Sequence, residues 1–360
     1  MSEVRQFTVS TEDDGIRLDR WFKRNLPDTS FNLVSRWSRT GQLRLDGKRA
    51  GPGDRVEAGQ VVRVPPADPA AADRPAKPQR QTLSEDEIAF VNEMVIYRDP
   101  AAIVVNKPPG LATQGGTKTN VHLDGLLDGL IEGDAARPKL VHRLDKDTSG
   151  VLLIARTPRA AAYFSKSFSG RTARKVYWAI VMDVPSIEDG IIELPIGKQF
   201  GTGGEKMCID EEQGLPSKTR YRVIERAGNR AAWVELQPLT GRTHQLRVHM
   251  AAIGHPIVGD GKYAGQEAFL TGAISRKLHL HARRLRIDHP DGGRIDVTAE
   301  LPSHFAETIA NLGFDLAAGD LPLDEVKFSE TPEGKRKATT AAAKARRKER
   351  KGERRSRGRG

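Results

Sequence analysis

Apolar residues recur at two different spacings in the first part of the chain, which separates predicted helices from predicted strands. In residues 16–26 and 31–38 they return every three or four positions, which indicates two short helices. Residues 42–48 alternate and run into an Asp-Gly turn, and residues 61–64 indicate another strand. We therefore expect a small α/β domain over residues 1–64.

The rest of the chain contains more strand-like runs than helical ones. The runs do not alternate regularly with helices, which favours an α+β fold over a doubly wound one. We expect this second domain over residues 84–318, beginning with a short acidic helix at 84–94. The expected strands cover residues 103–105, 150–155, 177–181, 232–236 and 278–287, and further helices are expected near 122–132, 159–170 and 244–253.

A Pro- and Ala-rich segment over residues 65–83 reads as an extended linker between the two domains. Residues 319–360 form a C-terminal extension. From about residue 335 it holds almost no apolar side chain larger than Ala, so we expect it to be disordered when free.

The composition, 38% hydrophobic and 29% charged, is that of an ordinary globular protein. We expect a cytoplasmic protein with no membrane contact, because the chain has no long apolar run and its polar N-terminus lacks the features of a signal peptide. A single cysteine, Cys208, excludes an internal disulfide and a cysteine-based zinc site.

The C-terminal tail, residues 335–360, accounts for the whole net charge of +11. Thirteen Lys or Arg and two Glu lie between residues 335 and 360, so residues 1–334 sum to zero. A second basic region lies in residues 15–63, where eleven Lys or Arg face five acidic residues. Arg20, Arg36 and Arg39 stand on its two predicted helices, and we expect them to contact a polyanion.

Three segments carry candidate chemistry. Residues 141–150, VHRLDKDTSG, place Asp145 on a polar loop before a buried strand, where catalytic groups are often presented. Tyr177 begins an apolar strand after a basic turn, and a phenol there can stack on a base or take a proton. Each has an ordinary reading beside the functional one: a salt-bridged loop and a half-buried tyrosine.

The third segment is LTGRTHQLRVH, residues 239–249. Thr243 is the expected N-cap of a helix that starts at His244, with Leu246 in its buried stripe and Arg247 elsewhere on its surface. Arginines near a helix N-terminus, here Arg242, favour phosphate binding. The ordinary reading is an amphipathic helix with a solvated basic side.

Other chemistries are not supported. His244 and His249 are five residues apart and do not share a helix face, and His279 and His281 have no matching carboxylate or cysteine, so we expect no metal. No phosphate-binding glycine loop or G-x-S-x-G elbow occurs, and the glycines at 201–204 have the wrong spacing and read as a flexible loop.

Each segment alone is a weak signal, but the three together, in this order along the chain, point to one family. His142-Arg143-Leu144-Asp145 with Thr148-Ser149-Gly150, Lys175-x-Tyr177 and the residues 241–249 resemble the RluA-type pseudouridine synthase family over about residues 95–305. The same pattern includes Asn106-Lys107-Pro108-Pro109-Gly110. The detailed match, including Gly115-Gly116, looks closest to the branch of the family that acts on large-subunit ribosomal RNA. Residues 15–64 look like an S4 RNA-binding domain.

The resemblance implies a mixed sheet with a central RNA cleft, and site-specific isomerisation of uridine to pseudouridine after base flipping. Asp145 would be catalytic, Tyr177 would lie against the base and take the C5 proton, Arg247 would pair with Asp145, and Arg143 would fill the space left by the flipped nucleotide. Other expected RNA contacts are His142, Arg242, Thr243, His244, Arg20, Arg36 and Arg39. The chemistry needs no cofactor, and we expect a monomer that binds RNA, not DNA.

Two alternatives remain open at this point. In the first, the chain is a pseudouridine synthase that acts on transfer or messenger RNA. In the second, it is a ribosome-assembly protein that binds RNA and has kept the fold but lost the reaction. The basic tail either folds on ribosomal RNA or only keeps the protein in solution.

Overall fold

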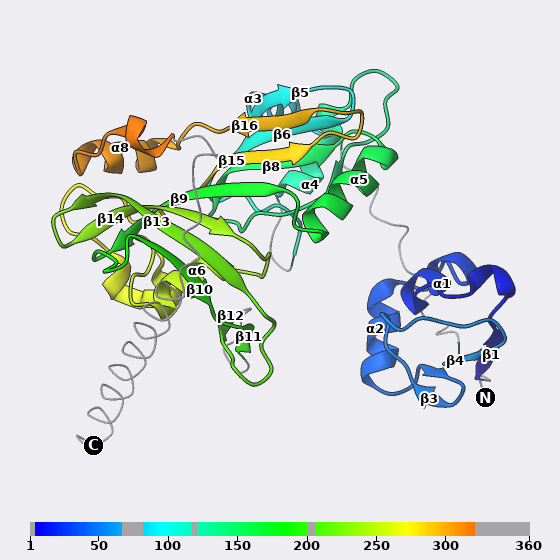
Figure 1. Ribbon diagram of the computed structural model, residues 1–360. Helices are drawn as coiled ribbons and strands as arrows, with labels where there is room; N and C mark the ends of the chain where they lie inside the picture. The colour runs from blue at the N-terminus through cyan, green and yellow to red at the C-terminus, as the bar shows by residue number, and fades with distance from the viewer. Residues whose placement is uncertain (1–3, 67–81, 117–120, 200–205, 321–360) are drawn as a thin grey trace, which may run out of the picture. The chain divides into compact units, whose positions relative to one another are not determined.

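The computed structural model describes residues 4–66, 82–116, 121–199 and 206–320 (Figure 1). The chain divides into two compact units, residues 1–82 and 83–360, and each is described by itself. The predicted loop of glycines at 201–204 and the predicted disorder beyond residue 335 lie outside the described residues, as does most of the predicted linker.

The first unit packs two helices on a four-stranded sheet in the order β1-β4-β2-β3. The two predicted helices and the Asp-Gly turn are confirmed. The helices bury Leu18, Trp21 and Phe22 from one and Val34 and Trp37 from the other against the sheet. The elements are β1 (Arg5–Thr8), a 3-10 turn (Thr11–Asp13), α1 (Leu18–Asn25), α2 (Phe31–Arg39), β2 (Arg44–Leu45), β3 (Lys48–Arg49) and β4 (Val61–Val64).

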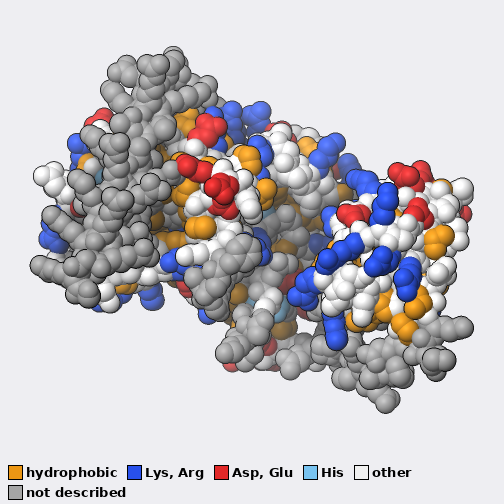
Figure 2. Space-filling model, turned by 90° about the horizontal axis from the view of Figure 1, so that it is seen from below, with side chains coloured by type: hydrophobic (Ala, Val, Ile, Leu, Met, Phe, Trp, Pro, Cys, Tyr) orange, Lys and Arg blue, Asp and Glu red, His pale blue; other side chains and the backbone are white. Residues whose placement is uncertain are grey.

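Several basic side chains stand among polar, acidic and apolar ones on the visible face of this unit, which lies at the right of Figure 2. Arg20, Arg36 and Arg39 are exposed, and none forms an ion pair with another residue in the described ranges. Arg17 and Arg24, by contrast, are paired with Asp19 and with Glu12 and Asp13.

The second unit is built on a ten-stranded mixed sheet, which confirms the α+β prediction. The main order is β10-β13-β14-β9-β15-β8-β6-β5, with β16 and β7 paired at the side, and β11 and β12 form a separate hairpin. The strands are β5 (Val95–Arg98), β6 (Ala102–Lys107), β7 (Lys139–Leu140), β8 (Ser149–Ala155), β9 (Arg174–Met182), β10 (Asp189–Glu193), β11 (Ile196–Gln199), β12 (Lys206–Ile209), β13 (Lys218–Ala227), β14 (Ala231–Pro238), β15 (Leu280–Asp288) and β16 (Arg294–Thr298).

Helices cover both faces of this sheet. No helix among the described residues is long and apolar enough to cross a membrane. The α-helices are α3 (Glu85–Glu93), α4 (Leu123–Leu126), α5 (Pro158–Ser169), α6 (Gln245–Ala252), α7 (Gly261–Ala264) and α8 (Ser303–Asn311), and 3-10 turns cover Leu127–Leu130, Gly265–Ala268 and Leu316–Gly319.

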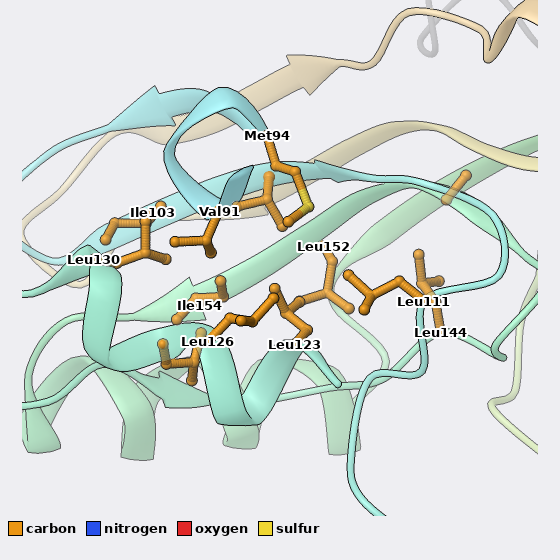
Figure 3. Close-up of a cluster of buried hydrophobic side chains, with 13 residues drawn as sticks. Val91, Met94, Ile103, Leu111, Leu123, Leu126, Leu130, Leu144, Leu152 and Ile154 are labelled. Atoms are coloured by element: carbon orange, nitrogen blue, oxygen red, sulfur yellow. The ribbon is translucent and has the colours of Figure 1, made fainter. Parts of the chain in front are cut away.

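The unbroken apolar run of β8 is explained by burial on two sides. Leu152 and Ile154 point to one face, where they lie against α3 and α4 (Figure 3). Val151 and Leu153 point to the other face, which Phe164 of α5 covers. A strand covered on both faces needs no polar alternation, so it reads as a continuous hydrophobic run.

A parallel pair of strands joins the two halves of the sheet. Strand β15 lies between β9 and β8, and Ser149 and Gly150 pair with His281 and Ala282. Gly150 has a φ of 108°, and a Cβ there would lie 2.2 Å from the Ala282 carbonyl oxygen, so only glycine allows this approach. The joint brings the loop before β8 beside β9.

Candidate active site

Asp145 lies on the loop between β7 and β8, and two side chains from the preceding segment hold this loop. The Thr113 hydroxyl donates to the Leu144 carbonyl at 2.6 Å and accepts from the Leu144 N–H at 3.1 Å. The Lys107 ammonium donates to the Lys146 carbonyl at 3.1 Å. The backbone on each side of Asp145 is therefore fixed, while its side chain stays 21% exposed.

Lys107 is a site residue that the sequence reasoning did not select. It is fully buried, and besides the Lys146 carbonyl it donates to the carbonyls of Pro108 at 2.9 Å and Leu111 at 2.7 Å. Burial lowers the pKa of Lys107 to about 7, against the raising effect of the Asp147 and Asp145 charges. A lone lysine inside the apolar strand β6 was the signal for it.

A cavity of about 420 Å³ opens beside Asp145 and is lined by residues from both halves of the sheet. Its volume suits a small-molecule or nucleotide pocket. A second cavity of about 550 Å³ shares Asp145, His244 and Arg247 with the first. The first cavity brings together all eight site residues predicted in this unit, which are His142, Arg143, Asp145, Tyr177, Arg242, Thr243, His244 and Arg247, and adds Lys175, Leu246 and Leu280.

Tyr177 lies on β9 in the wall of the first cavity. Burial, and then the charge of Asp145, raises its pKa above the ordinary value. The side chain is therefore a neutral phenol at neutral pH. It can pack against a ring, but it is a poor base, because a phenol removes a proton efficiently only as the phenolate. This electrostatic environment disfavours the expected role of Tyr177 in taking the C5 proton.

The predicted N-cap at Thr243 is wrong. The helix α6 begins at Gln245, and its N-cap is His244, whose φ of 54° lies in the left-handed region. The Gln245 side chain imposes this turn, since it accepts from the Thr240 hydroxyl and the Arg242 N–H and donates to the Lys218 carbonyl. Such a conformation costs about 1–3 kcal/mol, and strain of this kind gathers at functional sites.

The expected pair between Arg247 and Asp145 is also wrong. Arg247 is buried, not on the helix surface, and its guanidinium donates to both carboxylate oxygens of Asp260, at 2.8 and 2.7 Å. Asp260 is only 1% exposed, so it needs a charged partner more than the partly solvated Asp145 does. Among the described residues, His244 lies at ion-pair distance from Asp145, with 3.8 Å between Nε2 and Oδ2.

His142 has a structural contact that the sequence did not indicate. Its Nε2 accepts the Leu153 N–H at 2.9 Å, and its ring stacks on Phe168 at 4.2 Å. Burial, and then the charge of Lys175, lowers the pKa of His142 to about 3, so it is neutral. Arg143 is exposed at the cavity, while Arg242 and Thr243 are half-buried in its wall.

No three His, Cys, Asp or Glu side chains gather as a metal ion would require, within the part of the chain that the structure describes. His249 instead contacts Ser217, Thr219 and the Leu194 carbonyl inside the core. The groups that the cavity offers for chemistry are therefore one carboxylate, two imidazoles, a phenol and several cations.

Comparison with known proteins gives this arrangement a family. The model described as RNA pseudouridylate synthase matches residues 101–252. Ribosomal large subunit pseudouridine synthase C of Haemophilus influenzae is 34% identical over 81% of this chain and 89% of that protein, and the Escherichia coli protein of the same name is 34% identical over 81% and 91%. The solved structure of human RNA pseudouridylate synthase domain containing 4 has a TM-score of 0.54 at 28% identity, and covers 65% of this chain and 99% of that one.

The chain belongs to the RNA pseudouridylate synthase family. It is accordingly an enzyme that isomerises uridine to pseudouridine.

Proposed function

We propose that this enzyme modifies uridines in large-subunit ribosomal RNA and that Asp145 is its catalytic residue. The observation that carries the proposal is the position of Asp145, whose loop is held on both sides while its carboxylate faces two adjoining cavities. The names of the bacterial relatives support the RNA target. No comparable observation favours a transfer or messenger RNA target, or a protein that has lost the reaction.

The reaction needs few groups because it changes only connectivity. The bond between uracil N1 and C1′ breaks, the base turns, and a bond between C5 and C1′ forms. C5 then loses its proton and N1 gains one, so the product has the composition of the substrate. Asp145 either attacks C1′ or removes a proton from C2′, and both steps need an ionised, aimed carboxylate.

The walls of the first cavity fit a flipped uracil. Tyr177, Leu246 and Leu280 offer ring and aliphatic surfaces, and Tyr177 lies against the base in this proposal. Extruding the base costs a few kcal/mol, and the exposed Arg143 offsets part of that cost by filling the gap and contacting phosphate. Arg242 and Thr243 contact the RNA beside it.

The first unit binds RNA as an S4-like domain in this proposal, with residues 65–83 as linker and 84–318 as catalytic domain. Two helices on a small sheet, with the exposed Arg20, Arg36 and Arg39 on the helices, support it. Phosphate contacts of this kind hold an RNA in place but read little of its sequence. The proposal also includes a monomer acting in the cytoplasm.

The test maps pseudouridines by carbodiimide treatment and primer extension on RNA from cells with and without the gene. Wild type should restore the lost large-subunit sites and Asp145→Asn should not. Asp288→Asn, a carboxylate on β15 outside both cavities, is the control and should restore them. Full restoration by Asp145→Asn would overturn the catalytic assignment, and survival of all large-subunit sites in the deletion strain would overturn the target.

A further inference from the structure

His244 lies between the Asp145 carboxylate and a tyrosine that no sequence motif singled out. Its Nδ1 is 2.6 Å from the hydroxyl of Tyr263, and its Nε2 is 3.8 Å from Asp145 Oδ2. The left-handed backbone of His244 directs the ring into this position. The two nitrogens of one imidazole thus face two different partners, so the location of its proton matters.

The hydrogen atoms in this chain of contacts can be counted. The Tyr263 oxygen already accepts the backbone N–H of Met207, on strand β12, at 3.2 Å. If the Tyr263 hydroxyl then donates to Nδ1, the single proton of the neutral ring is on Nε2 and faces the carboxylate. The opposite tautomer would turn the Nε2 lone pair toward Asp145, which is repulsive.

Both ring systems are uncharged in this environment. Burial lowers the pKa of His244 and raises that of Tyr263 to about 12. Charged side chains surround the two rings. Arg247 holds Asp260 and lies 5.1 Å from the Tyr263 ring centroid, Lys206 lies 5.9 Å from it, and Lys262 and Asp145 complete the set.

We propose that Tyr263 is a positioning residue, which holds His244 in the tautomer that presents an Nε2–H donor to Asp145. The proposal rests on the proposed catalytic role of Asp145. A neutral donor orients the carboxylate and adds no further positive charge to that of Arg247, which is bonded to Asp260 and also feels the charge of Asp145. At 3.8 Å the two atoms are beyond hydrogen-bond distance, and we expect the contact to shorten when RNA binds, as catalytic hydrogen bonds often do.

The proposal also gives the β11–β12 hairpin a part in the site. Met207 packs with Val248 of α6 and with Tyr263, and its N–H donates to the Tyr263 oxygen, which leaves the hydroxyl proton free to point at His244. The hairpin thereby helps to hold the Tyr263 ring where its hydroxyl meets His244.

The first test reads the tautomer without any RNA. In the full-length protein labelled with ¹⁵N-histidine, the two ring nitrogens of His244 are identified by the signals that His244→Gln removes. We expect the proton on Nε2 in wild type and a mixture of tautomers in Tyr263→Phe. A proton on Nδ1 in wild type would overturn the proposal.

The second test measures kcat and KM on large-subunit RNA from cells that lack the gene. Tyr263→Phe keeps the ring over Arg247 and should lower kcat about tenfold with KM changed less than twofold. His244→Gln provides an amide N–H toward Asp145 that does not depend on Tyr263, so adding Tyr263→Phe to it should change kcat less than twofold. An equal loss in both backgrounds would show a merely structural role and overturn the proposal.

A control separates this outcome from a general loss of stability. Tyr97→Phe, on strand β5 at the edge of the sheet, removes a hydroxyl bond of the same length, 2.6 Å, to Asp99, and should leave kcat unchanged. If Asp145→Asn is fully active in the same assay, the proposed function fails. If Asp145→Asn is inactive while Tyr263→Phe matches wild type, only the role of Tyr263 fails.

Discussion

Removal of Asp260 tests how much the buried ion pair beside the active site stabilises the second unit. Arg247 and Asp260 are 8% and 1% exposed in their side chains and share two hydrogen bonds. Asp260→Ala leaves a mostly buried guanidinium without its carboxylate partner. Breaking a buried pair on one side costs about 3–5 kcal/mol. With a urea m-value of about 3 kcal/mol per M, the unfolding midpoint should fall by about 1–1.7 M.

The midpoint is measured by amide hydrogen exchange in urea on peptides from α6 and β14, which report on the second unit alone. Asp288→Ala is the matched control, since its pair with Arg294 is 59% and 58% exposed and should contribute less than about 1 kcal/mol. The double variant Arg247→Met with Asp260→Leu removes both charges and should regain most of the lost stability. Equal midpoints for Asp260→Ala and Asp288→Ala would refute the reasoning.

Three further outcomes are expected. Gly150→Ala should lose at least about 3 kcal/mol in urea unfolding, because its Cβ would overlap the Ala282 carbonyl; a smaller loss would mean that β8 and β15 separate easily. Lys107→Met should lower kcat at least tenfold with little change in KM, since three carbonyls around the Asp145 loop lose their donor; unchanged kcat would show that Thr113 is sufficient. Burial lowers the pKa to about 3 for His142 and His281 and to about 4 for His249 and His279. The free energy of unfolding should therefore fall as pH falls from 6.5 toward 4, by up to about 1.4 kcal/mol per pH unit for each of these histidines, because the unfolded chain takes up protons that the folded chain does not. A urea midpoint that is independent of pH would contradict this.

The sequence predicted the elements whose burial leaves a clear pattern. Strands β8 and β14 are buried on both faces and read as apolar runs, and α5 and α6 show helical spacing. Strands β10 to β13 were not predicted, because they are half-buried and mix charged with apolar residues. The arginine-rich β13 is held by pairing with β10 and β14, which is a long-range effect that no local window contains.

The composition of the cavity was predictable, but its internal contacts were not. The motif residues line one cavity with Asp145, as the family resemblance implied. Arg247 pairs with Asp260 instead of Asp145, a choice that depends on which carboxylate is more deeply buried. Burial is a property of the packed chain, so Lys107 and Tyr263 were likewise found only in three dimensions.

The place of β15 in the sheet has a consequence for how the enzyme is made. Apart from its pairs with β15, β8 pairs with β6 and β7, and β9 pairs with β14, so β15 is the strand that joins the half carrying Asp145 to the half carrying Tyr177. Residue 280 follows the end of β8 at Ala155 by 125 positions. At about 5–20 residues per second, a ribosome needs about 6–25 s to make that stretch. A nascent chain therefore keeps Asp145 and Tyr177 on separate halves of the sheet until β15 has been made and pairs with both β8 and β9.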